Sequence, residues 1–320
     1  MTTRIIGTGS YTPERVVTNQ ELSEIVDTSD EWIRSRTGIR ERRIAADETT
    51  SDMAAIAAAR ALEQSGVSPE DIDLILLGTS SPEYCFPNGA CEVQAKLGAV
   101  NAVCYDISAA CTGFVYALNT AHAFISAGIY KRALVIGADV MSKLTDWEDR
   151  STCVLFGDGA GAAVVQADET GLIGMNMSCD GKKGRVLTCT ARSNGSFFTG
   201  NKPEMGYIYM DGQEVFKFAV KKVPECIETM LRDTDTSVEE IRYFVLHQAN
   251  YRIIESIAKR LKADISRFPV NMERYGNTSG ASVAILLDEM NRSGKLKRGD
   301  KIVLAGFGGG LTLGASLLQW

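Results

Sequence analysis

The sequence repeats its own order of elements, and this repetition constrains the fold more than any single motif does. Residues 4–10, RIIGTGS, resemble residues 172–178, LIGMNMS, and each stretch opens one half of the chain with a short apolar strand. In both halves a helix, an acidic turn, a second strand, a small-residue turn into a helix and two further strands follow in the same order. We therefore predict an α/β fold built from two similar halves, residues 1–170 and 171–320.

Several of the predicted strands are almost continuously apolar. They lie within residues 73–81, 132–139, 242–250 and 301–308. A sheet covered by helices on both faces requires such strands, because neither side of the strand meets water. Each half is therefore expected to hold a mostly apolar mixed sheet between helices.

Two segments have no counterpart in the other half. Residues 141–156 interrupt the first half at a point where the second half, GFGGG (306–310), runs almost directly into its last strand. Residues 193–212 form another unmatched stretch, which is rich in glycine and aromatic residues. Binding residues concentrate on loops that a rigid scaffold positions, so both segments are expected to contact the substrate.

Composition and charge argue against several classes of protein. The net charge of −6 gives no overall basic surface for nucleic acid or for an anionic membrane. No apolar run reaches the roughly 18 residues that span a bilayer, and the N-terminus lacks a signal-peptide core, so a cytoplasmic protein is expected. The eight cysteines form no CxxC pair and the chain has only two histidines, so we expect free thiols and no metal site.

Cys111 is the first candidate for chemistry. It follows a predicted strand and two alanines, and it opens the predicted helix 111–121. The positive end of a helix dipole is expected to lower the pKa of such a thiol and to make its thiolate available. The small neighbours Ala109, Ala110 and Gly113 leave room for a substrate carbonyl, whose oxygen the Cys111 N–H could bind. On local sequence alone, a cysteine packed under the sheet is an equally good interpretation.

His247 and Asn277 are candidates to act with Cys111. His247 ends a predicted strand, where α/β proteins place active-site residues, whereas His122 lies in an alanine-rich helix and is interpreted as structural. Asn277 lies at the counterpart of the Cys111 turn, and by itself it is better interpreted as a helix N-cap. If a pseudo-twofold axis relates the halves, Cys111 and Asn277 face each other. The glycines of 306–310 would then approach closely and supply a second oxyanion N–H.

Together these motifs resemble β-ketoacyl-acyl carrier protein synthase III, a condensing enzyme of the thiolase fold. The resemblance rests on AACTGF around Cys111, LHQAN at 246–250, GNTSGAS at 276–282, GFGGG at 306–310, SDEWIRSRTGIRERR at 29–43 and FGDGAGAAV at 156–164. It covers essentially the whole chain. The fold that it implies, a thiolase-like duplicated five-layer α-β-α-β-α architecture, agrees with the internal repeat.

The resemblance implies an acyltransferase that initiates fatty acid biosynthesis. Cys111 would take an acyl group from an acyl-coenzyme A, after which malonyl-acyl carrier protein would lose CO2 and its carbanion would attack the acyl-cysteine. His247 and Asn277 would donate hydrogen bonds to the enolate oxygen, and the N–H groups of Cys111 and Gly309 would bind the oxyanion. No cofactor is expected, because the coenzyme A thioester is a substrate.

The resemblance also implies binding residues. Trp32 is expected to stack on the adenine of coenzyme A, although it is otherwise an ordinary residue of an amphipathic helix. Phe307 is expected to be a gate beside the nucleophile, and Phe86 is expected to cross a homodimer interface and floor the acyl pocket. The full set of expected coenzyme A and acyl contacts is Trp32, Arg36, Arg150, Phe216, Asn250, Phe307 and Phe86.

Carrier proteins are acidic, so a basic patch is expected to dock malonyl-acyl carrier protein. The candidate residues lie at helical spacing on two predicted helices, and they are Lys217, Lys221, Arg252, Lys259 and Arg260. A charge run of this kind is otherwise simply a solvated helix face. The patch is therefore a prediction that needs a direct test.

Other enzymes with similar residues fit less well. A papain-like hydrolase has Cys, His and Asn in this order with a spacing of roughly 130–150 residues, but its C-G-[SA]-C-[WY] motif is absent around Cys111. A thiolase needs a second catalytic cysteine near the C-terminus, and no cysteine follows Cys226. A hydroxymethylglutaryl-type synthase needs a carboxylate base beside the nucleophile, and the sequence identifies none. A non-catalytic protein of this fold would not need all three catalytic positions.

The main alternative is a synthase III-like condensing enzyme of a specialised polyketide or quinolone pathway, which would use the same residues. The primer that the enzyme accepts also stays open. Leu313 occupies a position where the family often carries tryptophan. This difference bears on packing behind the pocket and on primer size rather than on the chemistry.

Overall fold

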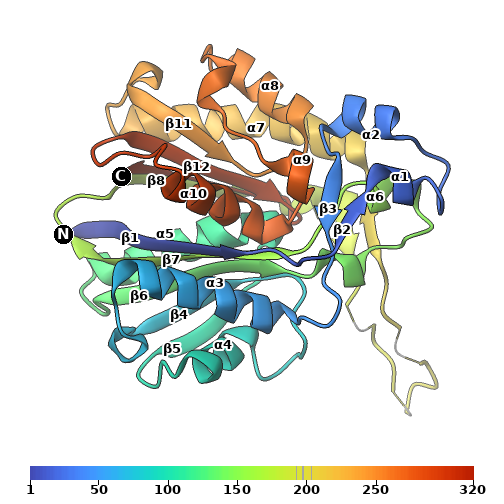
Figure 1. Cartoon of the computed structure of the whole chain (residues 1–320), viewed down its shortest axis with the longest axis horizontal. Helices are drawn as coiled ribbons and strands as arrows, with labels where there is room; N and C mark the ends of the chain where they lie inside the picture. Colours follow the sequence, from blue (N-terminus) through green and yellow to red (C-terminus); the bar gives the residue numbers. More distant parts are fainter. Residues whose placement is uncertain (192, 197, 203) are drawn as a thin grey trace.

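Two β-sheets lie between three layers of helices in the computed structural model, which describes residues 1–191, 193–196, 198–202 and 204–320 (Figure 1). The first sheet contains β1 (Thr2–Tyr11), β7 (Gly159–Asp168), β6 (Arg132–Asp139), β4 (Leu74–Gly78) and β5 (Val103–Ile107), in this order. The second contains β11 (Ile241–Leu246), β12 (Lys301–Gly308), β13 (Thr312–Gln319) and β8 (Leu172–Cys179), in this order. Strand by strand, β1, β7, β6 and β4 correspond to β8, β13, β12 and β11, which confirms the predicted duplicated α/β arrangement.

The helices cover the sheets on every face (Figure 1). Helices α3 (Thr50–Ser65) and α4 (Gly89–Leu97) cover the outer face of the first sheet. Helices α5 (Gly113–Ser126) and α10 (Ser282–Arg292) lie between the sheets, and α7 (Gly212–Asp233) and α8 (Tyr251–Arg260) cover the outer face of the second. The result is the five-layer α-β-α-β-α order that the sequence predicts.

Strand β4 shows why its residues are apolar without alternation. Leu74 and Leu76 pack in the central cluster with α5 and α10, whereas Ile75 and Leu77 pack in the outer cluster with α3 and α4. Successive side chains of a strand point to opposite faces, so a strand with helices on both sides buries every position. All four side chains have no exposed surface.

Shorter elements connect these layers. The short strands and helices are β2 (Val16–Thr18), β3 (Glu41–Arg43), β9 (Leu187–Cys189), β10 (Ile208–Met210), α1 (Asn19–Leu22), α2 (Asp30–Thr37), α6 (Arg150–Cys153) and α9 (Met272–Tyr275). The 3₁₀ turns are η1 (Pro69–Asp71), η2 (Ala110–Thr112), η3 (Met141–Leu144), η4 (Gly181–Val186), η5 (Val238–Glu240), η6 (Ile265–Arg267) and η7 (Ser279–Ala281). Within the described residues, no helix has both the length and the apolar character that a bilayer crossing requires.

The position of Cys111 differs from the prediction that it opens a helix. Cys111 lies in the 3₁₀ turn η2, and α5 begins only at Gly113. The chain enters this turn at Ala110, whose φ of +46° lies in the left-handed region outside a regular α-helix. The regular helix therefore starts after the turn that presents the thiol.

Candidate functional site

A cavity of about 640 Å³ lies where the carboxyl ends of strands from both sheets meet. It brings together Cys111, His247 and Asn277, which are far apart in the sequence, and it also includes Phe307 and Gly309. Both unmatched segments contribute to its wall, as predicted: Leu144, Val154 and Phe156 come from residues 141–156, and Ile208 and Met210 come from residues 193–212. Residues 197 and 203 of the latter segment lie outside the described residues.

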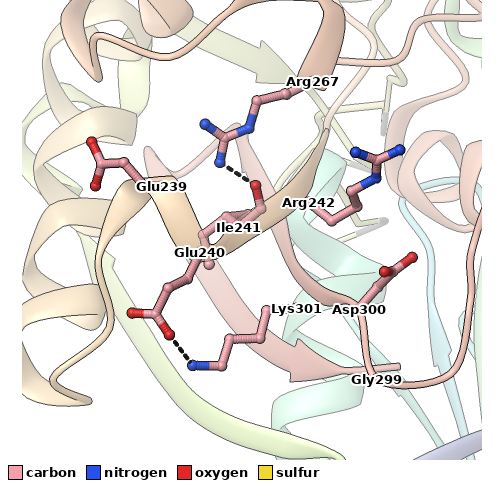
Figure 2. Close-up of a pocket in the computed structure, with 8 residues that line it drawn as sticks. All are labelled: Glu239, Glu240, Ile241, Arg242, Arg267, Gly299, Asp300 and Lys301. Atoms are coloured by element: carbon pink, nitrogen blue, oxygen red, sulfur yellow. Dashed lines mark hydrogen bonds and ion pairs between the residues drawn. The ribbon is translucent and has the colours of Figure 1, made fainter.

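A second hollow lies at the amino-terminal ends of β11 and β12, the opposite end of the second sheet from the cavity (Figure 2). Its charged side chains are Glu239, Glu240, Arg242, Arg267, Asp300 and Lys301. Lys301 pairs with Glu240, and Arg267 donates to the Ile241 carbonyl oxygen. The acidic and basic side chains of this hollow are equal in number, and none of the predicted site residues lines it. The chemistry is therefore assigned to the first cavity.

The Cys111 thiol is buried in the first cavity beside the glycine loop. A Cβ atom at Gly308 would lie 2.8 Å from the Cys111 backbone nitrogen and 3.0 Å from its Cβ, so only glycine permits this approach. Burial raises the pKa of the Cys111 thiol to about 12, although a hydrogen bond from the Ser279 side chain acts in the opposite direction. The predicted lowering of this pKa is therefore wrong for the closed cavity, because loss of hydration outweighs the field at the helix start.

His247 is held as a neutral ring. Its backbone N–H donates to the Ala305 carbonyl oxygen at 2.8 Å, and burial lowers the pKa of its imidazole to about 3. Its Nδ1 atom lies 2.6 Å from the Ser282 hydroxyl, whose oxygen accepts the Gln248 N–H at 3.4 Å. Because the Ser282 oxygen accepts the Gln248 N–H, its own hydroxyl proton can be donated to His247 Nδ1. The arrangement therefore favours the tautomer whose Nε2–H is the donor.

Asn277 is fixed by the end of the segment 141–156. Its backbone N–H donates to the Leu155 carbonyl oxygen at 2.8 Å, and its own carbonyl oxygen accepts the Gly157 N–H at 3.1 Å. Its Oδ1 atom accepts the Ser279 N–H at 2.9 Å, but Asn277 is not the helix N-cap that the alternative interpretation expected, because the N-cap of η7 is Thr278. Among the described residues, none accepts a hydrogen bond from its Nδ2 group. The Asn277 side chain therefore holds the first residue of η7, Ser279, and its Nδ2 group still has a donor for a ligand.

Four other predicted binding residues also line the cavity. Trp32, Phe216, Asn250 and Phe307 all contribute to its wall. The Arg150 guanidinium lies 5.1 Å from the centre of the Trp32 ring, and Arg150 donates to the Asp27 carbonyl oxygen at 2.8 Å. The Phe307 ring meets the His247 ring edge-on, with their centres 5.1 Å apart. The predicted gate thus contacts one of the three central residues directly.

Arg150, Arg36 and Phe86 lie outside the lining of the cavity, although Arg150 contacts Trp32 in that lining. The Arg36 side chain is exposed, and its carbonyl oxygen accepts the Asn250 amide at 3.0 Å. The Phe86 side chain is 86% exposed, so it does not floor the pocket of its own chain. Its predicted place in the pocket of a second copy stays a prediction.

The five basic residues predicted to dock a carrier protein are exposed and lie on the adjacent helices α7 and α8. Two of them are in ion pairs: Lys217 with Glu214 at 2.8 Å, and Arg260 with Glu225 at 3.2 Å. Within the described part of the chain, Arg252 has no acidic partner in an ion pair. Its charge is therefore available to another molecule.

Some residues of the site were not found from the sequence. Ser282 contacts His247 and the Ser279 N–H donates to Asn277, but the sequence analysis singled out neither serine. Leu313 pairs in register with Phe307 and is buried in the core between the second sheet and helices α7 and α8, consistent with a packing role behind the pocket. Over the described residues, no cluster of three or more His, Cys, Asp or Glu could hold a metal ion.

Comparisons with known proteins agree with this geometry. Two family models match: 3-oxoacyl-[acyl-carrier-protein (ACP)] synthase III at residues 105–181, and its C-terminal region at residues 231–320. A β-ketoacyl-[acyl-carrier-protein] synthase III of Clostridium acetobutylicum is 54% identical, over 99% of this chain and 98% of that protein. The crystal structure of a 3-oxoacyl-[acyl-carrier-protein] synthase III from Aquifex aeolicus, 48% identical, superposes with a TM-score of 0.93 over 99% of this chain and 100% of that one. A priming β-ketosynthase of a polyketide pathway, 38% identical, also reaches 0.93, over 99% and 96%.

Proposed function

Since the chain belongs to the β-ketoacyl-acyl carrier protein synthase III family, we propose that it joins an acyl group from coenzyme A to malonyl-acyl carrier protein with loss of CO2, and so starts fatty acid biosynthesis. The observation that carries the proposal is the meeting in one cavity of a buried thiol, a neutral imidazole and an amide whose Nδ2 group donates to no described residue. The test supplies both substrates and follows CO2 and the 3-ketoacyl product. Folded protein that yields neither would contradict it.

The first half-reaction moves the acyl group to Cys111. Its sulfur attacks the thioester carbon, the bond from that carbon to the coenzyme A sulfur breaks, and coenzyme A leaves as the thiol. The negative oxygen of the tetrahedral intermediate needs donors that are already in place. The backbone N–H groups of Cys111 and Gly309 are proposed for this role, and both residues line the cavity.

The second half-reaction forms the carbon–carbon bond. Malonyl-acyl carrier protein loses CO2, and the electrons of the broken bond move onto the thioester oxygen as an enolate. The His247 Nε2–H and the Asn277 Nδ2–H are proposed to stabilise this oxygen, which needs donors rather than a strong base. The enolate carbon then attacks the acyl-cysteine, the carbon–sulfur bond breaks, and the Cys111 sulfur is free again.

Trp32 and Arg150 are proposed to hold the nucleotide end of coenzyme A. Trp32 lines the cavity and the Arg150 guanidinium lies over its ring, which supports an aromatic and cationic contact with the adenine and phosphates. Trp32→Ala should raise KM for the acyl-coenzyme A about tenfold with kcat nearly unchanged, because stacking a base on an aromatic ring contributes about 1–3 kcal/mol. Trp32→Phe, which keeps an aromatic ring, should have a KM between those of the wild type and Trp32→Ala. An unchanged KM in Trp32→Ala would remove this contact from the proposal.

The exposed basic residues of α7 and α8 are proposed to dock the acidic carrier protein. Arg252→Glu should raise KM for malonyl-acyl carrier protein about tenfold at low salt, because an attractive charge becomes repulsive. KM for acyl-coenzyme A should not change. The matched control is Lys131→Glu, an exposed lysine just before the start of the central strand β6 and so at the opposite end of the first sheet from the cavity. If Lys131→Glu raised KM for malonyl-acyl carrier protein as much as Arg252→Glu, the effect would come from the net charge of the protein rather than from a docking contact.

We also infer a homodimer that pairs along β5. This strand lies at the end of the first sheet, with Val103 49% exposed, and the nearby loop exposes Tyr84 (56%) and Phe86 (86%). Unpaired edge strands and exposed aromatic side chains are unfavourable in water and favour a second copy. Light scattering should give about twice the 34.7 kDa of one chain. A single-chain mass at micromolar concentration would contradict the dimer.

A specialised pathway is the second candidate, since a polyketide priming ketosynthase superposes on the chain as well as the fatty acid relatives do. The two functions differ in the carrier protein rather than in the chemistry. Comparing KM for malonyl groups on a fatty acid carrier and on a polyketide carrier separates them. A clear preference for the polyketide carrier would replace the proposed pathway and keep the mechanism.

A further inference from the structure

The duplicated fold gives two corresponding turns at the cavity different supports. The turns η2 and η7 correspond to each other, since each is a 3₁₀ turn of three residues whose first residue has a left-handed backbone, with a φ of +46° at Ala110 and +50° at Ser279. Each turn contacts a strand of the opposite half, η7 with β6 and η2 with β12. The residue that ends each strand therefore determines how the turn is held.

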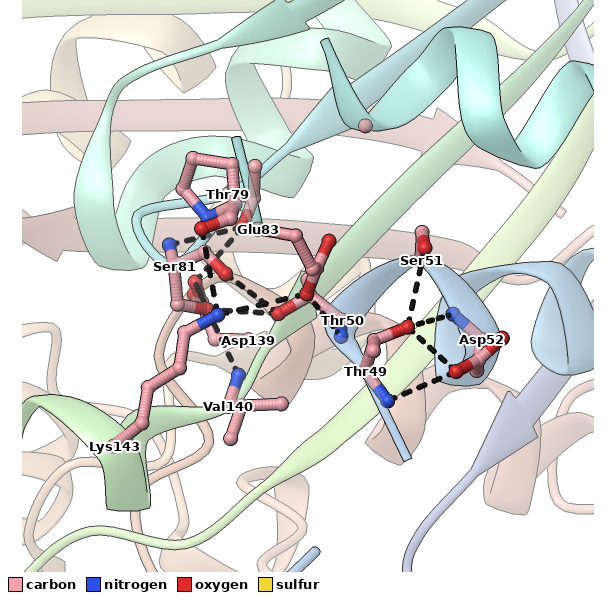
Figure 3. A network of polar contacts seen from close by, with 12 residues as sticks. Thr49, Thr50, Ser51, Asp52, Thr79, Ser81, Glu83, Asp139, Val140 and Lys143 are labelled. Atoms are coloured by element: carbon pink, nitrogen blue, oxygen red, sulfur yellow. Dashed lines mark hydrogen bonds and ion pairs between the residues drawn. The ribbon is translucent and has the colours of Figure 1, made fainter. Parts of the chain in front are cut away.

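A carboxylate holds η7. Asp139 is the fully buried last residue of β6, and its Oδ2 atom accepts the Gly280 N–H of this turn at 3.1 Å. Its Oδ1 atom accepts the hydroxyl protons of Thr79 at 3.1 Å and Ser81 at 2.9 Å and the Ser80 N–H at 2.7 Å (Figure 3). The N–H of the second residue of η7 is therefore occupied by the protein itself.

A glycine stands at the equivalent place beside η2. Gly308 ends β12 as Asp139 ends β6, and a Cβ atom on Gly308 would lie 2.8 Å from the Cys111 nitrogen. Because Gly308 has no side chain, it offers no acceptor to the Cys111 N–H, and this N–H is left for the oxygen of a substrate. The missing carboxylate also means that another group must tie η2 to the second sheet.

Two threonine hydroxyl groups make this tie. Thr312 is the partner of Gly308 in the last pair of the β12–β13 ladder, and its Oγ1 atom lies 2.6 Å from that of Thr112, the last residue of η2. The same Thr312 atom lies 3.0 Å from the Gly309 carbonyl oxygen and 3.3 Å from the Ala109 carbonyl oxygen. Carbonyl oxygens only accept, so the Thr312 proton points to them and the Thr112 hydroxyl donates to Thr312.

We propose that Thr112 and Thr312 are positioning residues, which fix the N–H groups of Cys111 and Gly309 relative to each other for the oxyanion. This proposal rests on the proposed function. The contact of the two hydroxyl groups joins the turn that carries Cys111 to the loop that carries Gly309. The glycines 308–310 have no side chains to restrict that loop, so its backbone depends on such neighbours. Oxyanion donors are effective only when they are in place before the charge develops.

The two half-reactions and the loss of CO2 should respond differently. An oxyanion forms in acyl transfer and in carbon–carbon bond formation, whereas the enolate of CO2 loss is assigned to His247 and Asn277. Thr312→Val keeps the side-chain shape and removes the hydroxyl. It should slow acyl transfer to Cys111 about tenfold with KM for acyl-coenzyme A unchanged, because misaligned donors cost less than the roughly 10²–10³ of a lost donor. CO2 release from malonyl-acyl carrier protein without a primer should keep the wild-type rate.

Three further variants distinguish positioning from general damage. Thr312→Ser keeps the hydroxyl and should keep most of the wild-type rate of acyl transfer. Thr112→Val removes the other hydroxyl and should match Thr312→Val, and the double variant should lose little more, because both changes break one contact. Ser316→Ala is the matched control on the same strand, since its buried hydroxyl donates to Asn119 of α5 at 2.7 Å outside the cavity lining. Slow acyl transfer in Thr312→Ser or Ser316→Ala would overturn the proposal.

Two small probes test the hydroxyl groups without coenzyme A. Iodoacetamide alkylates Cys111 at a CH2 carbon and forms no oxyanion, so Thr312→Val should react at the wild-type rate. With p-nitrophenyl acetate, the Cys111 sulfur bonds to the ester carbon, the bond from that carbon to the phenolic oxygen breaks, and p-nitrophenol leaves with the thiol proton. This acylation passes through an oxyanion, so Thr312→Val should be about tenfold slower, measured above the background of Cys111→Ser.

The outcomes separate this proposal from the proposed function. If the wild type reacts with the ester but accepts no acyl group from coenzyme A, the proposed function fails alone. Equal ester rates in the wild type and Thr312→Val would overturn the role of the threonines. Equal slowing of alkylation and acylation would also overturn it, since the thiol itself would then be displaced. If Cys111 took an acyl group from neither donor, both proposals would fail.

Discussion

Cys111→Ser is expected to form no acyl adduct with any acyl-coenzyme A thioester that modifies the wild-type protein. A serine hydroxyl holds its proton far more tightly than a thiol, and burial lowers the pKa of the neighbouring His247 imidazole, so the cavity offers only a weak base to remove that proton. In other enzymes, removing the covalent nucleophile lowers the rate on the order of 10⁴-fold or more. Intact-protein mass spectrometry with a panel of acyl-coenzyme A thioesters measures the adduct.

Cys85→Ser is the control for this experiment. Its thiol is exposed and lies outside the cavity lining, so this variant should take the acyl group as the wild type does. The thioester that modifies the wild type most completely also identifies the preferred primer. An adduct that survives in Cys111→Ser would move the nucleophile to another residue.

Asn277→Ala is expected to lose condensation by about 100-fold or more while Cys111 still accepts the acyl group. The reason is that the Nδ2–H donor is needed only once the enolate forms, and removing one such donor costs about 10²–10³ in rate. The acyl adduct is followed by mass, and 3-ketoacyl formation is followed with malonyl-acyl carrier protein. Full condensation by Asn277→Ala would refute the assigned role.

A second variant separates the donor of Asn277 from its structural contact. Asn277→Asp keeps an oxygen that accepts the Ser279 N–H, so η7 should be retained, but it removes the Nδ2–H donor. It should therefore condense as poorly as Asn277→Ala. The control Asn101→Ala changes an exposed asparagine far from the cavity and should retain activity. Good condensation by Asn277→Asp would assign the loss in Asn277→Ala to the turn instead of the donor.

The order of the strands and the identity of the three central residues could be predicted from the sequence. Strands such as β4 and β12 are buried on both faces, so their apolar runs are visible without any knowledge of their partners. Cys111, His247 and Asn277 stand in short motifs at the ends of such strands. These signals are local, because secondary structure depends mainly on neighbours along the chain.

The electrostatic state of the site could not be predicted in this way. The helix start suggested an acidic thiol, whereas burial among residues from both halves raises the pKa of Cys111. Desolvation depends on side chains that are remote in sequence, so no local pattern reports it. The same is true of the contact between Trp32 and Arg150, which lie on separate helices.

The sequence by itself thus determined the duplicated α/β fold, the cysteine, histidine and asparagine of the cavity, and the family to which they point. Only the tertiary structure decided that Cys111 is buried, which raises the pKa of its thiol, that Ser282 contacts the His247 ring, and that Asp139 of the first half accepts the Gly280 N–H of the second. The physical reason is distance along the chain. Strands can be recognised from consecutive residues. The hydrogen-bond partners of the site residues, and the loss of water around them, arise only when the two halves pack together.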